Sequence, residues 1–421
     1  MTKYAANRLA MLWSKLLPAT PAARILALSI LIQTTGLGLL TALGAIYFTK
    51  VLGLSVSQVG LGLTVAAGAG LLSGVPMGHL ADRIGPRGLL IVLLGCEAVA
   101  VLSYLLIDSF VLFLIIVSLY HFVDRAGSAV RGGLIARVVK AEEQVKVRAY
   151  LRSAGNLGFA FGAVLAGWGL QLDTPSAYRT LIVIAAVGYV LTMLGISQLP
   201  AVPAIAREHA ASPSAAIRDR PYMAFGLINM VMSFHYAVLE VGMPLWIASH
   251  TTTPKWMITV MFIINTTMVV ALQVWVSKRA ETLAMAKWAT IVAGGMLAAS
   301  CAFFGLSSQL TGLLVIAALL AAGLLHALGE MLQTASAWLL AYELAPSNAH
   351  GQYQGLFSTS TSTGMMLGSA VVVLLAVNGG TWGWLALGGL FLLPALLMPA
   401  VIKWAMRRFD SNETTAIASN T

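Results

Sequence analysis

The chain contains 421 residues, of which 59% are hydrophobic and only 10% are charged, and its mean hydropathy is +0.86. Soluble globular proteins carry about a quarter charged residues, so this composition excludes a soluble enzyme or binding protein and predicts a polytopic membrane protein. The net charge of +10 does not indicate nucleic-acid binding, because the basic residues lie in short connections between apolar runs and form no stripe.

The first 21 residues predict a cytoplasmic amphipathic helix that lies on an anionic membrane surface. Lys3, Arg8 and Lys15 alternate with apolar residues, and Trp13 suits the headgroup layer. Because the charges interrupt the apolar residues, this segment does not resemble a cleavable signal peptide.

Apolar runs after this segment predict an all-α protein with twelve transmembrane helices in two six-helix bundles. The first bundle occupies residues 22–199 and the second 221–406, with a polar cytoplasmic linker at 200–220 and a cytoplasmic tail at 407–421. The expected spans are 24–48, 57–78, 88–107, 109–135, 149–171, 178–199, 221–248, 255–276, 286–306, 310–340, 352–377 and 382–405.

The distribution of Lys and Arg predicts the orientation. With the N-terminus in the cytoplasm, only Lys50, Arg179 and Lys255 among the basic residues of the connections face outside. We therefore expect a multi-pass protein of the cytoplasmic (inner) membrane with both termini cytoplasmic.

The two halves of the chain repeat. A shift of 206 residues places Gly158 on Gly364, Gly162 on Gly368 and Asp124 on Glu330. Parallel repeats of six helices are typical of alternating-access transporters, whose site lies between the halves near the membrane midplane. The four glycines predict close helix packing.

A short charged turn separates the second and third expected spans. It contains Gly78, Asp82, Arg83, Gly85 and Arg87, so a tight connection holds three charges at the membrane surface. Arg83 and Arg87 alone could be ordinary cytoplasmic anchors, but that interpretation explains neither Asp82 nor the glycines.

Placing an ionisable side chain inside a bilayer costs free energy, so each such residue inside the expected spans requires a structural or functional explanation. They are Glu97, His121, Asp124, Arg125, Arg131, Arg152, His235, Glu240, His326 and Glu330. Arg131 and Arg152 could snorkel to the membrane surface, and satisfaction within the core is the simpler interpretation of Glu97 and His121.

His326 and Glu330 are four residues apart and share a helix face. We predict proton coupling through Glu330 and His326 together with Asp124 and Glu240. The alternatives are that Glu330 forms a static clamp with an Arg and that Glu240 is a buried core acid or a substrate contact. The candidates for the substrate cavity are His235, Tyr236, Glu240, Arg152 and Asn156.

Asp124 and Arg125 are neighbours, and adjacent helical residues point about 100° apart. We expect one of them to reach another element of the protein.

No catalytic pattern accompanies these residues. The chain has no phosphate-binding Walker loop, no H-E-x-x-H, no G-x-S-x-G and no Cys/His cluster with metal-ligand spacing. Cys96 and Cys301 both lie in apolar runs. We therefore expect no enzyme activity, no cofactor and no metal, with protons as the coupling ion.

The turn Gly78-His79-Leu80-Ala81-Asp82-Arg83-Ile84-Gly85 resembles the signature of the major facilitator superfamily between its second and third spans. The resemblance implies the twelve-helix fold of that family and a conformational latch. In this latch Asp82 would cap the helix that begins near Gly351, and Arg87 would pair with Asp124, with Gly78, Arg83, Gly85 and Arg125 as the other members.

Within the superfamily the chain is similar to drug:proton antiporters of the LmrP and MdtH branch. The similar residues are Asp124-Arg125, Gly329-Glu330, Ala345-Pro346, the run from Gly351 to Gly355, and Arg152, Asn156, Gly158 and Gly162. Ala163 stands where the antiporters have Pro, and His350 replaces an Arg.

The resemblance implies an antiporter that exports amphiphilic or lipophilic compounds, such as drugs or antibiotics, in exchange for protons, and we expect the protein to be a monomer. Its partners would be the small amphiphilic substrate, protons and the lipid bilayer, and no nucleic acid. The missing Pro favours the alternative, a symporter or facilitator that imports a small nutrient or metabolite. A non-transporting receptor on the same scaffold is a third hypothesis, against which the acids inside the spans argue.

Overall fold

The computed structural model describes residues 20–204, 212 and 214–419 of the chain, and these residues form helices and no strand. Residues 1–19 of the predicted amphipathic segment, much of the predicted linker and the last two residues of the tail lie outside this range. Contacts divide the chain into two units. The first contains the described residues up to Ser73 and from Leu80 to 204, and the second contains Gly74–His79 and the described residues from 212 onward.

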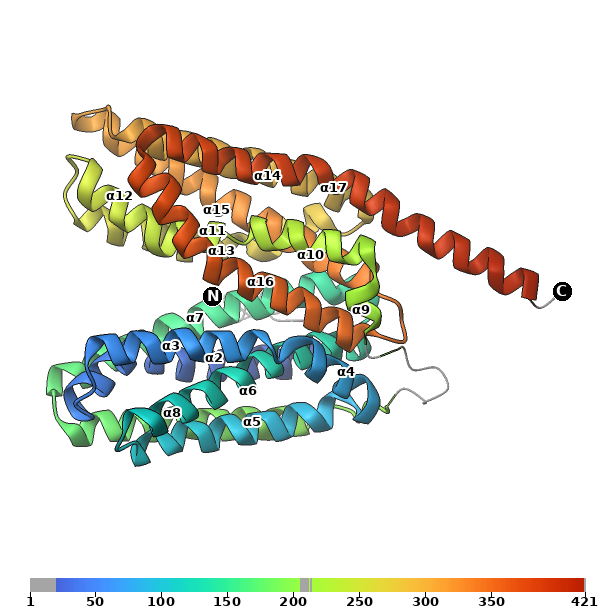
Figure 1. Ribbon diagram of the computed structural model, residues 1–421, viewed down its shortest axis with the longest axis horizontal. Coiled ribbons are helices and arrows are strands. Elements are labelled where there is room, and N and C mark those ends of the chain that lie inside the picture. The colour runs from blue at the N-terminus through green and yellow to red at the C-terminus, as the bar shows by residue number, and fades with distance from the viewer. Residues whose placement is uncertain (1–19, 205–211, 213, 420–421) are drawn as a thin grey trace, which may run out of the picture. The chain divides into compact units, whose positions relative to one another are not determined.

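The first unit is built from long helices that run alongside one another (Figure 1). Its elements are α2 (Pro21–Ile46), a π-helical turn (Tyr47–Val51), α3 (Val56–Leu71), the end of α4 (Gly74–Ile84), α5 (Pro86–Leu102), a 3-10 turn (Ser103–Leu106), α6 (Phe110–Val138), α7 (Ala141–Leu172) and α8 (Pro175–Ser197). Helix α2 packs against α7 and α8, α3 packs against α6, and α5 packs against α6 and α8.

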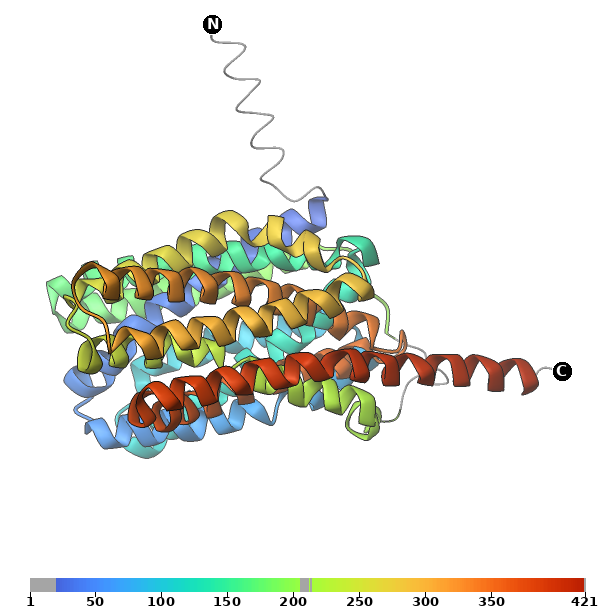
Figure 2. The ribbon, with the colours of Figure 1, turned by 90° about the horizontal axis from the view of Figure 1, so that it is seen from above.

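The second unit repeats this plan. Its elements are α9 (Ala215–Arg218), α10 (Arg220–Met232), α11 (His235–Ala237), a π-helical turn (Val238–Gly242), α12 (Met243–His250), α13 (Trp256–Ser277), a 3-10 turn (Lys278–Ala280), α14 (Leu283–Ser307), α15 (Gly312–Glu343), α16 (His350–Val372), a π-helical turn (Val373–Val377) and α17 (Asn378–Ser419). Helix α14 packs against α15 and α17, and α10 packs against α16 and α17. Figure 2 shows α17 as the long red helix at the C-terminal end.

Nine helical stretches of the described chain are long and apolar enough to cross a membrane, or ten if the bent pair α3 and α4 counts as one span. One stretch, His350–Arg407, has 58 residues. As one straight helix, at 1.5 Å per residue, it would be about 87 Å long, far more than the ~30 Å of a bilayer core. Gly380 breaks its helical backbone, so the stretch contains more than one helix. The polytopic membrane class is thus established, whereas the count of twelve and the cytoplasmic termini stay predictions.

The helix boundaries follow from local sequence. Thr20, Ser109, Thr174 and Thr282 each accept a hydrogen bond from a backbone N–H of the first turn that they precede. Proline at the start of α2, α5, α8 and α10 fits the positions where an N–H has no partner within the helix. A polar cap or an initial proline therefore marks where these helices begin.

The charged turn is short because α5 follows α4 directly at Gly85. This glycine has a φ of 94°, a backbone conformation that only glycine adopts without strain. Asp82 is buried, whereas Arg83 is exposed. In the first part of α4, a Cβ at Gly78 would collide with the carbonyl oxygen of Gly351 in the same unit, so this glycine allows close backbone approach.

The connection between α7 and α8 carries an exposed ion pair. Asp173 has a φ of 41° and accepts a hydrogen bond from the Tyr178 hydroxyl at 2.6 Å and one from Lys50 Nζ at 3.0 Å. These two donors, the hydroxyl first, hold the pKa of Asp173 below its usual range. The stabilisation that the ionised Asp173 gives the folded state through these hydrogen bonds is therefore present at neutral pH, and it is lost as the pH falls through the lowered pKa of Asp173. Because Asp173 and Lys50 are exposed to solvent, this stabilisation is small.

The internal repeat has a structural counterpart. Gly158 and Gly162 of α7 face the backbone of α2, where added Cβ atoms would collide with the carbonyl oxygens of Leu31 and Thr35. Gly364 of α16 faces the carbonyl oxygen of Met230 on α10 in the second unit, and a Cβ at Gly368 would lie 3.1 Å from Phe234 Cα. In each unit the same pair of glycines thus lets one helix approach the first membrane-length stretch of that unit, α2 or Arg220–His250.

We expect Gly162→Ala to lower the free energy of unfolding by about 1–3 kcal/mol, because the new Cβ meets Thr35 and lies 2.8 Å from Leu39 N. The matched control is Gly167→Ala on the same helix, where an added Cβ would have no neighbouring atom within 4 Å. Thermal unfolding of the two purified variants in detergent checks this. Equal melting temperatures would contradict the close packing of α7 on α2.

Candidate functional site

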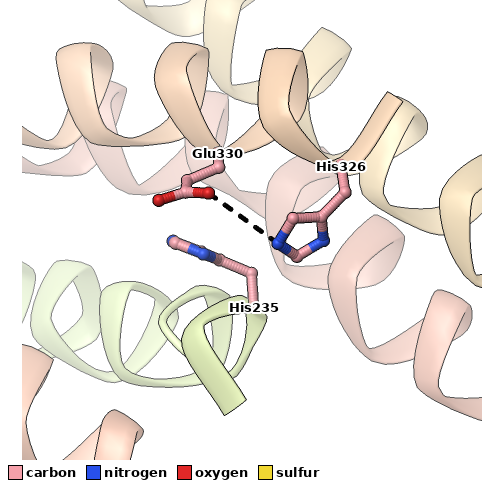
Figure 3. A group of neighbouring side chains, drawn as sticks. All are labelled: His235, His326 and Glu330. Carbon is pink, nitrogen blue, oxygen red and sulfur yellow. Dashed lines mark ion pairs between the residues drawn. The ribbon is translucent and has the colours of Figure 1, made fainter. Parts of the chain in front are cut away.

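The second unit contains a buried cluster of His235, His326 and Glu330 (Figure 3). His326 Nε2 lies 3.8 Å from Glu330 Oε2, and the rings of His235 and His326 meet edge to face with centroids 5.9 Å apart. One potential ligand atom from each of the three side chains lies within 4.8 Å of the others. Two imidazoles and one carboxylate therefore converge on one point inside an apolar bundle.

Two different local structures bring these side chains together. His326 and Glu330 are one turn apart on the regular helix α15. His235 lies where its span is least regular, after α10 ends at Met232 and before the π-helical turn Val238–Gly242. Pro244 has no N–H group that could donate an α-helical hydrogen bond to the main-chain carbonyl oxygen of Glu240. The absence of this bond accounts for the π-helical turn, which is wider than an α-helical turn. Such π-helical turns often occur at functional sites.

Glu330 is held by more than its own helix. Asn265 Nδ2 on α13 donates to the Glu330 carboxyl group at Oε2, at 2.9 Å. The Thr334 hydroxyl, on the same helix as Glu330, donates at 2.7 Å to the main-chain carbonyl oxygen of Glu330. Both side chains are buried. A buried carboxyl needs such partners, because an isolated charge in a medium of low dielectric is strongly unfavourable. The cluster thus orients one carboxyl group that can gain or lose a proton.

Uncharged polar side chains extend from this cluster along α15, α10 and α16. Gln333 Nε2 donates to Asn229 Oδ1 at 3.2 Å, and Asn229 Nδ2 donates at 2.9 Å to the hydroxyls of Ser360 and Thr361. We call these four residues the polar seam. A connected set of amides and hydroxyls offers both donors and acceptors in an otherwise apolar bundle.

The first unit contains a different buried cluster, formed by Gln33 on α2, Glu97 on α5 and Arg131 on α6. Gln33 Nε2 donates to Glu97 Oε2 at 3.0 Å, and Arg131 Nη2 donates to Gln33 Oε1. Glu97 is fully buried, and the positive charge of Arg131 acts on it. Gly127 makes room, because a Cβ there would lie 3.0 Å from Glu97 Oε1. Glu97 is thus a core acid with one satisfied oxygen, Oε2, whereas its buried Oε1 has no hydrogen-bond partner among the described residues.

Asp124 has surroundings unlike those of Glu330. Its Oδ2 lies 3.5 Å from Arg125 Nε, and the side chains of Asp124 and Arg125 are 17% and 39% exposed. The two neighbours pair with each other, and Arg125 also reaches another element, because its Cγ lies 3.0 Å from the position of a Cβ added at Gly70 on α3. Arg87 does not pair with Asp124 in the described chain: its Nη2 donates to the Ser197 carbonyl oxygen at the end of α8.

The remaining candidates fall at separate places. The Tyr236 ring stacks obliquely on His235 with centroids 4.1 Å apart, and Glu240 is exposed on the π-helical turn. Arg152 and Asn156 are partly buried on α7 in the first unit. The structure thus joins His235, His326 and Glu330, with Tyr236 beside them.

The amide side chains are functional candidates that the sequence-based predictions missed. Gln33, Asn229, Asn265 and Gln333 are all buried and all contact the clusters or the polar seam. A signal for them exists, since an amide in an apolar helix costs free energy unless it is hydrogen-bonded. Predictions based mainly on the ionisable residues inside the spans do not include these amides. The closeness of His235 to His326 and Glu330 has no comparable signal, because the distance between these residues along the chain does not predict that they meet.

Solved structures of transporters are similar to the chain over nearly its whole length. A bacterial homologue of the iron transporter ferroportin, in the outward-facing state, is 16% identical, with a TM-score of 0.74 over 92% of this chain and 100% of the other. The proton:xylose symporter XylE is 14% identical, with a TM-score of 0.67 over 90% and 94%. The E. coli fucose:proton symporter FucP is also 14% identical, with a TM-score of 0.67 over 92% and 98%.

At these identities the structural comparisons establish the fold and not the cargo. No curated protein sequence matches the chain. A family model described as Major Facilitator Superfamily matches residues 26–369, which is most of the chain. Together with the repeated helical units and the signature turn at Gly78–Gly85, this match establishes that the chain is a member of the major facilitator superfamily of membrane transporters.

Proposed function

We propose that the chain exports amphiphilic or lipophilic compounds, such as drugs or antibiotics, in exchange for protons across the cytoplasmic membrane. The observation that carries the proton coupling is the buried carboxyl group of Glu330, whose Oε2 lies 3.8 Å from His326 Nε2 and 2.9 Å from Asn265 Nδ2. Acids inside membrane helices mark proton pathways in transporters. Glu330 is thus the coupling acid, and the protein works as a monomer with protons as its only coupling ion.

In this proposal the transport cycle exchanges the proton on Glu330 for substrate. Protonation from outside removes the negative charge beside His326, and release to the cytoplasm restores it. The turn residues Gly78, Asp82, Arg83, Gly85 and Arg87 act as the latch between conformations, and Asp124 and Glu240 are further proton sites. A membrane potential contributes about 2.3 kcal/mol per charge per 100 mV, which is enough to drive the exchange.

A second candidate function is the import of a small polar solute together with protons. The polar seam of Asn229, Gln333, Ser360 and Thr361 favours it, because amides and hydroxyls recognise hydroxylated solutes by hydrogen bonds. Two of the structural neighbours are named as sugar:proton symporters. The missing Pro after Gly162 supports this candidate as well.

Transport by proteoliposomes with an imposed pH gradient separates the two candidates. Export predicts that fluorescent amphiphilic cations accumulate in vesicles with an acidic interior and that a protonophore abolishes the accumulation. Import predicts instead that labelled sugars or small acids follow protons down the gradient. Transport of polar solutes alone would overturn the export proposal, and equal fluxes with and without the protonophore would overturn proton coupling.

A further inference from the structure

The cluster of His235, His326 and Glu330 has a donor set that the proton-coupled function does not require. Proton transfer at Glu330 needs one carboxyl group and at most one neighbouring base. Here a second imidazole comes from another helix, so that two nitrogen atoms and one oxygen atom all lie within 4.8 Å of one another. Three such donors at one point are the protein part of a metal site.

We propose that His235, His326 and Glu330 bind a divalent first-row transition-metal ion of the Zn²⁺ type. Zinc takes imidazole nitrogen and carboxylate oxygen at about 2.0–2.2 Å, which in a tetrahedral site places donor atoms about 3.3 Å apart. The His326 Nε2 and Glu330 Oε2 atoms are 3.8 Å apart. The donor atoms must therefore move closer by about 0.5 Å between His326 and Glu330, and by no more than about 1.5 Å for any pair, since all pairs lie within 4.8 Å. Side-chain rotations can supply movements of this size.

The donor types select the class of metal. Ca²⁺ and Mg²⁺ take six or more ligands, nearly all oxygen, which this cluster does not offer. Two imidazoles and one carboxylate suit Zn²⁺, Co²⁺ or Ni²⁺. Three protein ligands leave one coordination position for water or a small solute, as in open zinc sites.

A neighbouring contact supports the carboxylate ligand. Asn265 donates to Glu330 Oε2 and so fixes the carboxyl group from α13, the role that outer hydrogen bonds play around metal ligands. All three ligands are at most 3% exposed, which distinguishes the cluster from a chance group of surface histidines. The backbone on both sides of His235 is irregular, as is frequent at functional sites.

Metal and proton compete at this site, because a ligand must give up its proton to bind a metal. The titratable groups around Glu330 are His326 on its own helix, His235 and Tyr236 on α11, and Glu240 on the following turn. A bound ion therefore excludes the coupling proton. The site itself does not depend on the proposed transport function, since it can be measured without any flux.

Titration of the purified full-length protein in detergent with Co²⁺ tests the proposal. Co²⁺ bound by four or five ligands has strong visible absorption, whereas the hydrated ion absorbs weakly. We expect one Co²⁺ per chain with such bands, and their loss when Zn²⁺ is added. His235→Gln, His326→Gln and Glu330→Gln should each weaken binding by at least about tenfold. His250→Gln, an exposed histidine at the end of the same span, is the control and should bind as the parent does.

A variant that should gain a new absorption band distinguishes the loss of a metal ligand from the loss of metal binding by misfolding. His326→Cys should still bind Co²⁺ and should add a thiolate-to-cobalt absorption in the near ultraviolet, which the parent lacks although it contains Cys96 and Cys301. Failure of Co²⁺ to give strong visible bands with the parent protein would overturn the proposal. Bands that survive in the three Gln variants, or the absence of the new absorption in His326→Cys, would do so as well. None of these outcomes depends on which solute the protein transports.

Discussion

Glu330→Gln is expected to reduce proton-driven accumulation of substrate by at least about tenfold while leaving the protein folded. The amide of Gln is nearly the same size as the carboxyl group and can still accept the hydrogen bond from Asn265. It cannot carry a proton between the two sides of the membrane. Coupling is therefore lost, whereas exchange of substrate across the membrane without a gradient continues, because that exchange needs only the conformational change.

Both activities can be measured in the same proteoliposomes. The first is accumulation under an imposed pH gradient, and the second is exchange of labelled for unlabelled substrate at equal pH. Glu343→Gln is the matched control, because Glu343 is an exposed acid at the end of the same helix, and it should behave as the parent in both measurements. Asp124→Asn is compared in parallel, since the sequence repeat pairs Asp124 with Glu330. Wild-type accumulation by Glu330→Gln would contradict its role as the coupling acid.

Arg131→Leu is expected to lower the free energy of unfolding by about 3–5 kcal/mol, the cost of leaving a buried acid without its compensating charge. Glu97 is fully buried on α5, and Gln33 connects it to Arg131 through two hydrogen bonds. Removal of the guanidinium group leaves Glu97 without this nearby positive charge and the Gln33 amide oxygen without this donor. The cluster joins α2, α5 and α6, so the loss weakens the contacts of the whole first unit.

A double-mutant cycle measures this coupling. Arg131→Leu, Glu97→Leu and the double variant are compared by thermal unfolding in detergent, and the double variant should be more stable than Arg131→Leu because no buried charge remains uncompensated. Arg125→Leu is the control: its side chain is 39% exposed, and its ion pair with Asp124 should contribute no more than about 1 kcal/mol. Additive losses in the cycle would show that Glu97 and Arg131 do not stabilise each other.

The two halves differ in where they place their acids. The repeat predicts equivalent roles for Asp124 and Glu330, but Asp124 pairs with its exposed neighbour Arg125, whereas Glu330 is buried beside His326 and Asn265. Inside the apolar helices of the first unit the fully buried acid is instead Glu97, on which Gln33 and the charge of Arg131 act. The repeated halves thus share their helix packing at the paired glycines, while the surroundings of the paired acids differ.

The amino-acid sequence by itself determined the membrane class, the positions of most long helices and the shared face of His326 and Glu330. These features follow from composition and from the 3.6-residue helical period, which act over short distances along the chain. The sequence repeat also predicted that glycines of one helix face another, and the structure places Gly158 and Gly162 against α2.

Only the tertiary structure decided which polar groups meet. His235 joins residues about ninety positions later in the chain, and Gln33 joins Glu97 and Arg131 on two other helices. Helical periodicity fixes neighbours within a helix, but it does not say which faces of distant helices pack together. Side-chain rotation can also override it, as when Asp124 and Arg125 bend toward each other. Contacts between helices depend on packing, which is a property of the whole unit and not of any short segment.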